Sequence, residues 1–180
     1  MSDVPIPATD PPPGWTRHAF ERTKPVKAPA HAVWQWLQAP ETFTRQVWPY
    51  WVEFVEGSGT DGASGFSEGV LNVHHGPLIH AAGVLTRIDE DARLRDLHYF
   101  YGSYMISMKL IRPALLRFAV AEDEQNSDAC HLTVRVECDI RPWIDGIWTN
   151  LQRFFWWSFF SDAARKGRRI AAGRGSHRRG

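Results

Sequence analysis

The last third of the chain carries an apolar pattern with the spacing of an α-helix. Apolar side chains recur there every three or four residues, which places them on one helix face. They are Ile144, Trp148, Leu151, Phe155 and Phe159. A second set widens this face and consists of Ile147, Phe154, Trp157 and Phe160. Because no proline or glycine interrupts residues 147–166, the pattern predicts one helix over 141–172, with an apolar face that needs a cover.

Alternation of apolar and polar residues predicts strands over most of the remaining chain. In the clearest strand, 129–140, every second residue is apolar and is expected to face inward. These residues are Cys130, Leu132, Val134, Val136, Cys138 and Ile140. Further strands are predicted over 15–27, 50–56, 70–75, 78–88, 93–101 and 115–122. Gly102 and Ser103 indicate a turn, after which 104–110 would continue the sheet.

Two short helices are predicted after the first strand. Pro29 stands where the first would begin, and Pro40 would end it and begin the second. The order of elements predicts an α+β fold, in which a curved antiparallel sheet of about six to seven strands wraps around the long C-terminal helix. That helix is the only element long enough to cover the apolar face of such a sheet.

Length and charge fit one domain with no strong electrostatic preference. The chain has 180 residues and a formal net charge of +1, so we expect one core and no nucleic-acid partner. Residues 1–14 are proline-rich and 173–180 are basic, which predicts a disordered leader and tail around a domain at 15–172. No signal-peptide pattern opens the chain, and Cys130 and Cys138 are expected to be buried, reduced thiols, so we predict a cytoplasmic protein.

Three stretches resemble the START/polyketide cyclase/birch-pollen-allergen superfamily, also called SRPBCC, which has the helix-grip fold. KPVKAPAHAVWQWLQAPETFTRQVWP at 24–49 is similar to the opening of the family. GVLTRIDEDARLRDLHYFYG at 83–102 is similar to its central strand pair, and LTVRVECDIRP at 132–142 is similar to its entry into the long helix. The resemblance covers about 15–172. These patterns indicate the fold and carry no catalytic signature, because the superfamily does not share one.

The resemblance implies a cavity between the sheet and the long helix that holds a hydrophobic or amphipathic small molecule. A lipid, a polyketide or another aromatic metabolite would fit this description. Inward strand parity and the helix pattern give the expected ligand-binding residues, which are Val84, Leu97, Phe118, Val134, Trp148, Leu151, Phe155 and Phe159. The Gly/Ser-rich segment 57–69 would be a mobile part of the entrance.

An enzyme is the alternative function, because some members of the superfamily are polyketide cyclases or aromatases. His80 is expected to point inward, and Tyr99 or Tyr101 could serve as its acid–base partner in a cyclisation or dehydration. The competing interpretation is that His80 is a core histidine satisfied by the backbone. The chain lacks the hydrolase elbow, the metalloprotease motif, Cys-x-x-Cys and the dinucleotide fingerprint, so no cofactor is expected.

Metal binding is not expected at the other histidines. His74, His75 and His80 flank a predicted turn, with His75 and His80 on one face, but the sequence places no third ligand beside them. Arg22 and Lys24 share the parity of the apolar residues in the first strand. They would either snorkel from a half-exposed strand or face an anionic ligand.

The surplus of aromatic residues on the C-terminal helix also allows partner binding. A homodimer through these residues is predicted. Contact with a membrane surface, supported by the basic tail, is the less favoured alternative.

Overall fold

The computed structural model describes residues 10–45, 51–55, 66–76, 79–104 and 107–177. The segments outside these ranges include residues 1–9 of the predicted leader and most of the predicted entrance loop. The strands are β1 Thr16–Val26, β2 Trp51–Val55, β3 Leu71–Gly76, β4 Ile79–Asp89, β5 Leu94–Tyr104, β6 Ile111–Glu122 and β7 Cys130–Ile140. The helices are α1 Ala30–Gln38, α2 Pro40–Arg45 and α3 Asp145–His177, the last preceded by a 3₁₀ turn at Pro142–Ile144.

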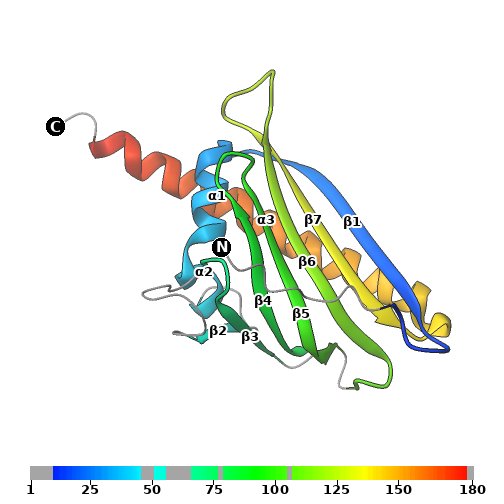
Figure 1. Cartoon of the computed structure of the whole chain (residues 1–180). Coiled ribbons are helices and arrows are strands. Elements are labelled where there is room, and N and C mark those ends of the chain that lie inside the picture. Colours follow the sequence, from blue (N-terminus) through cyan, green and yellow to red (C-terminus); the bar gives the residue numbers. More distant parts are fainter. Residues whose placement is uncertain (1–9, 46–50, 56–65, 77–78, 105–106, 178–180) are drawn as a thin grey trace.

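The strands form one antiparallel sheet in the order β1-β7-β6-β5-β4-β3-β2. α3 crosses one face of this sheet, α1 and α2 lie near one end, and the last turns of α3 extend past the sheet (Figure 1). β1 is an edge strand, a position that tolerates Pro25 because proline has no backbone N–H to donate to a second neighbouring strand. The predicted α+β helix-grip architecture, with two short helices after the first strand, is therefore confirmed.

The alternation in β7 predicts its orientation correctly. All six inward residues of this strand are at most 1% exposed and belong to the core under α3. Leu116, Phe118 and Val120 of β6 face the same core. Cys130 and Cys138 are buried and unbonded to each other, as predicted.

α3 approaches α1 closely at a glycine. A methyl group on Gly167 would lie 2.8 Å from Cβ of Ala28 and 3.0 Å from Cγ2 of Val33. The absence of a side chain at Gly167 therefore lets the second half of α3 pack against the start of α1, which closes one end of the interior.

The turn predicted at Gly102 and Ser103 is wrong, because β5 runs through both residues to Tyr104. Gly102 has φ +129°, and a Cβ there would lie 2.3 Å from the carbonyl oxygen of His80 on β4. Glycine is needed here for close approach of two strands. Residues 107–110 form a turn, in which Leu110 N–H donates to the carbonyl of Ser107, so this part of the predicted strand 104–110 is not a strand.

The buried face of α3 differs from the predicted stripe. Ile144, Trp148 and Phe159 are buried, but Leu151 is 37% exposed. Gln152 is buried in its place, because its Oε1 accepts a 2.6 Å hydrogen bond from the indole N–H of Trp156. The satisfied polar pair makes Gln152 suitable for the core, a possibility that apolar spacing alone does not reveal.

Candidate functional site

A partly open cavity lies where β3, β5 and β6 meet Phe43 of α2 and Phe66. Its lining is mostly apolar and consists of Phe43, Val52, Phe66, Asn72, His74, Leu85, Arg95, Leu97, Leu116 and Phe118. It spans about 270 Å³, a volume that includes space open to solvent, and only about 10 Å³ of it can hold the centre of a water molecule. That is room for about one water, so a larger ligand fits only after the surrounding side chains rearrange.

Arg95 is a buried cation in this cavity wall. It is 3% exposed and shares the inward parity of Leu97 and Tyr99 on β5. Its Nη1 donates to the backbone carbonyl of Leu37 at 2.6 Å and to Oε1 of Gln38 at 2.9 Å. Leu37 lies at the C-terminal end of α1, where carbonyls lack intrahelical partners and attract positive charge. One edge of the guanidinium therefore caps α1.

A short hydrogen-bonded chain links this cap to a carboxylate on the surface. Nε2 of Gln38 donates to Oε1 of Glu90 at 3.0 Å, and the indole N–H of Trp34 donates to Oε2 of Glu90 at 2.6 Å. By accepting a hydrogen bond from the Gln38 amide, Glu90 makes the amide oxygen that faces Arg95 a stronger acceptor. Glu90 does not form an ion pair with Arg95. The positive charge in the cavity wall is only indirectly compensated.

Two further polar groups face the cavity from β3. Oδ1 of Asn72 and Nε2 of His74 are buried and have no hydrogen-bond partner among the residues that the structure describes. Burial, with the positive charge of Arg95 as a smaller contribution, lowers the pKa of His74 to about 3. The imidazole is therefore neutral at physiological pH and can accept or donate one hydrogen bond.

Tyr99 lies beside His74, their ring centroids 5.3 Å apart in an edge-to-face arrangement. Burial raises the pKa of the Tyr99 phenol far above its ordinary value, and the phenol oxygen is buried without a hydrogen-bond partner among the described residues. The Tyr104 ring in turn lies 5.0 Å from Trp148 of α3. A line of polar aromatic groups therefore extends from the cavity towards the helix.

The predicted pairing of His80 with Tyr99 or Tyr101 is wrong. On β4 the core residues are Ile79, Ala81 and Leu85, so His80 has the opposite parity and is exposed. Tyr101 is 59% exposed, because an irregularity in the β4–β5 register places Gly83 opposite Tyr99 and Ala82 opposite Tyr101. One extra residue in β5 reverses which parity faces inward.

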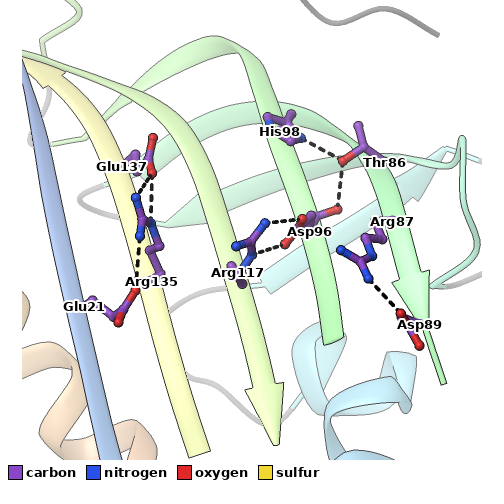
Figure 2. Close-up of polar contacts among 9 residues, drawn as sticks. All are labelled: Glu21, Thr86, Arg87, Asp89, Asp96, His98, Arg117, Arg135 and Glu137. Atoms are coloured by element: carbon purple, nitrogen blue, oxygen red, sulfur yellow. Dashed lines mark hydrogen bonds and ion pairs between the residues drawn. The ribbon is translucent and has the colours of Figure 1, made fainter. Parts of the chain in front are cut away.

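Val84 is also misplaced by the predicted parity. It is buried at 7% exposure but lies outside the core cluster, opposite His98 in the register. Thr86, which shares the parity of Val84, hydrogen-bonds Nδ1 of His98 at 2.7 Å (Figure 2). Val84 therefore packs on the outer face of the sheet.

The other predicted ligand-binding residues divide between interior and surface. Leu97 and Phe118 line the cavity. Val134, Trp148 and Phe159 are buried in the core but do not line the cavity. Phe155 is half-buried against Trp156, whereas Leu151 faces outward.

The outer face of the sheet carries paired charges. Arg117 binds Asp96 through Nε at 2.6 Å and Nη2 at 2.7 Å, and Arg135 contacts both Glu137 and Glu21 (Figure 2). The pairing of these cations with carboxylates contrasts with Arg95 in the interior.

The remaining histidines and cations do not add a second site. His75 and His80 pair directly across β3 and β4, and their ring centroids are 6.3 Å apart. Within the described ranges, no group of three or more His, Cys, Asp or Glu residues could hold a metal ion. Arg22 and Lys24 are half-buried, and Nζ of Lys24 lies 5.9 Å from the centre of the Phe160 ring, as a snorkelling side chain would.

The surplus aromatics of α3 are exposed. Phe154 is 74% exposed and Ile147 and Trp157 are each 58% exposed, although Phe160 is buried. No described helix is both long and apolar enough to span a membrane. Homodimerisation or membrane contact through this surface and a cytoplasmic location stay predictions; light scattering would test the first and vesicle flotation the second.

We expect His80→Ala and Tyr101→Ala to leave both stability and ligand binding nearly unchanged. Both side chains are exposed and away from the cavity, and surface substitutions of this kind typically change the free energy of unfolding by less than about 0.5 kcal/mol. Thermal melting and the fluorescence titration described below would measure the two quantities. A loss of binding in His80→Ala would restore this residue to the site.

Sequence reasoning missed Arg95, Asn72 and His74. The strand alternation that correctly turns Leu97 and Tyr99 inward also turns Arg95 inward. The sequence therefore contains the signal for burial of Arg95, but a charged residue is ordinarily assigned to the surface. His74 was placed on the face opposite His80, and the error at His80 moved both residues to the wrong side.

Comparison with known proteins supports the fold and goes no further. No family model and no curated protein matches the chain. Norcoclaurine synthase from Thalictrum flavum, in complex with dopamine and hydroxybenzaldehyde, is similar with a TM-score of 0.59 and 12% identity over 88% of this chain and 89% of that one. Ara h 8.0201 is similar with a TM-score of 0.60 and 13% identity over 87% and 99% of the two chains.

A protein from Nitrosospira multiformis gives a third match, with a TM-score of 0.61 and 14% identity over 83% of this chain and 95% of that one. The three matches cover 83–88% of this chain. At the level of fold, the chain is therefore a helix-grip protein, similar in structure to these three proteins.

Proposed function

We propose that this protein binds a small amphipathic molecule in the interior cavity formed by the sheet, Phe43 of α2 and Phe66. The polar group of the ligand would lie at Asn72, His74 and Arg95, and its apolar body would lie among the aromatic side chains. The supporting observation is that buried polar atoms of Asn72 and His74 lack partners among the described residues. An unsatisfied buried polar group costs about 1–3 kcal/mol, and a ligand that supplies the missing hydrogen bond would recover that energy.

The surrounding side chains suit an aromatic ligand. Phe43, Phe66 and Phe118 line the cavity, and Trp156 and Phe159 pack behind Phe118. An apolar pocket with a few polar anchors is the usual form of a small-molecule site. The norcoclaurine synthase of similar fold holds dopamine and hydroxybenzaldehyde, two small aromatic molecules with polar groups, which supports the same kind of ligand here.

Binding is favoured over acid–base catalysis by the environment of the interior groups. A general acid or base works best when its pKa lies near the working pH. His74 has a pKa of about 3, and burial moves the Tyr99 pKa in the opposite direction. His74 and Tyr99 therefore suit hydrogen bonding in fixed protonation states. The residues predicted for the cyclase alternative, His80 with Tyr99 or Tyr101, do not form an acid–base pair in the cavity.

Titration with the neutral fluorophore N-phenyl-1-naphthylamine tests this function, because the dye brightens in apolar surroundings. We expect saturable binding of one dye per chain, with tighter binding in Phe118→Ala, which enlarges the cavity. The double variant Phe154→Ala/Trp157→Ala removes exposed aromatics of α3 and serves as the control. No fluorescence rise, or a rise that disappears in this control, would refute an interior site.

A further inference from the structure

The hydrogen bonds of Arg95 leave one edge of its guanidinium open. A guanidinium has five N–H donors, and the two on Nη1 bond Leu37 and Gln38. Nε and Nη2 donate to no residue in the described part of the chain, and no described carboxylate forms an ion pair with Arg95. The capping of α1 therefore uses the N–H groups of Nη1, and the N–H groups of Nε and Nη2 have no acceptor among the described residues.

The open edge is the one that this protein uses to bind a carboxylate elsewhere. On the outer face of the sheet, Arg117 holds both oxygens of Asp96 through its Nε and Nη2, in two parallel bonds (Figure 2). Such two-point pairing matches the planar guanidinium to a planar carboxylate and is stronger than a neutral hydrogen bond. Arg95 precedes Asp96 in β5 and faces the interior with the same edge unused.

The cavity around Arg95 favours an anion attached to a flat apolar body. The guanidinium carbon lies 3.7 Å from the centre of the Phe66 ring and 5.3 Å from those of Phe43 and Phe118. No acidic residue lines the cavity, so an incoming anion meets no repulsion from its described walls. Because the cavity has room for about one water before its walls rearrange, a compact ring requires less rearrangement than a long chain.

We propose that the ligand is a ring-bearing carboxylic acid whose carboxylate binds Nε and Nη2 of Arg95 in a two-point contact. This inference rests on the proposed function and specifies its ligand class. The apolar ring lies against Phe43, Phe66 and Phe118, and Asn72 and His74 bond other polar groups of the ligand.

Arg95 carries the required charge at neutral pH. Burial lowers its pKa to about 9, and the nearby Tyr99 partly opposes this shift. A bound carboxylate would supply the counter-ion that the described interior lacks and would make burial of the guanidinium less unfavourable.

Matched acids and amides test the proposal by isothermal titration of the full chain at pH 7.5. The probes are benzoate and benzamide, 2-naphthoate and 2-naphthamide, and biphenyl-4-carboxylate and its amide, since each pair differs little except in charge. We expect at least one acid to bind at least tenfold more tightly than its amide. Arg95→Gln should reduce this preference to less than twofold, and Arg95→Lys should retain an intermediate preference because it keeps charge without the two-point edge.

Arg87→Gln is the matched control, because Arg87 lies exposed on β4 and pairs with Asp89. It makes the same change in charge and should leave the preference intact. Equal binding of acids and amides by the wild-type protein would overturn the carboxylate inference, even if Arg95→Gln fails to fold. In that case binding of the neutral dye or of the amides would leave the proposed function standing, whereas binding of neither dye nor probes would refute both.

Discussion

We expect Phe118→Ala to lower the free energy of unfolding by about 3–5 kcal/mol, the usual cost of removing a buried phenylalanine ring. Phe118 is 2% exposed and stands at the centre of the interior. Its ring centroid lies 5.4 Å from that of Phe159 and 6.0 Å from that of Trp156, so it joins the sheet to α3. Because a domain is stabilised by only about 5–15 kcal/mol, the loss is a large fraction of the total.

Urea denaturation of wild type and variant would measure this effect. Phe154→Ala deletes the same side chain from the exposed face of α3 and should change stability by less than about 0.5 kcal/mol. The contrast between the two phenylalanines tests which face of α3 is buried. Similar losses in both variants would mean that the exposed face is covered in solution, and a small loss in Phe118→Ala would contradict the packing.

The second large effect is the loss of stability in acid caused by His74. Its pKa is about 3 in the folded protein and about 6.5 in the unfolded chain. Below pH 6.5 the unfolded state therefore binds a proton that the folded state does not bind. Stability should fall by about 1.4 kcal/mol per pH unit from pH 6.5 down to about pH 3, or by about 4–5 kcal/mol in all.

His74→Gln removes this titration while keeping a polar side chain in the same place. The difference in unfolding free energy between wild type and His74→Gln should change with the slope of one proton over that pH range, since other titrating groups cancel. His80→Gln, at an exposed position on the adjoining strand, should follow the wild type. Parallel curves for wild type and His74→Gln would show that His74 is not buried in its neutral form.

Much of the fold can be predicted from the sequence, because some elements show a clear contrast between apolar and polar positions. β7 alternates apolar and polar residues without exception, and the two prolines at 29 and 40 mark the short helices. β4 gives no such contrast, because Ala81 and Ala82, and Val84 and Leu85, make both parities apolar. Its orientation depends on tertiary packing, and the choice of the wrong parity placed His80 inside.

The candidate site could be predicted less well for two physical reasons. The extra residue in β5 near Tyr101 arises from the way β4 and β5 pair, and the residue types at that point do not predict a bulge. Arg95 and Gln152 are polar residues in the interior, where each is accommodated by a specific partner. Hydropathy patterns assign polar residues to the surface. They therefore miss buried polar groups, which are the groups that would recognise a ligand.

Native mass spectrometry of the protein purified from its own cells tests the central claim most directly. Under gentle ionisation we expect each chain to carry one small molecule, which leaves on denaturation and can then be identified. A ring-bearing carboxylic acid among the released molecules would support both the binding function and the role of Arg95. A chain of unliganded mass under the same gentle conditions would contradict the claim that the interior is a binding site.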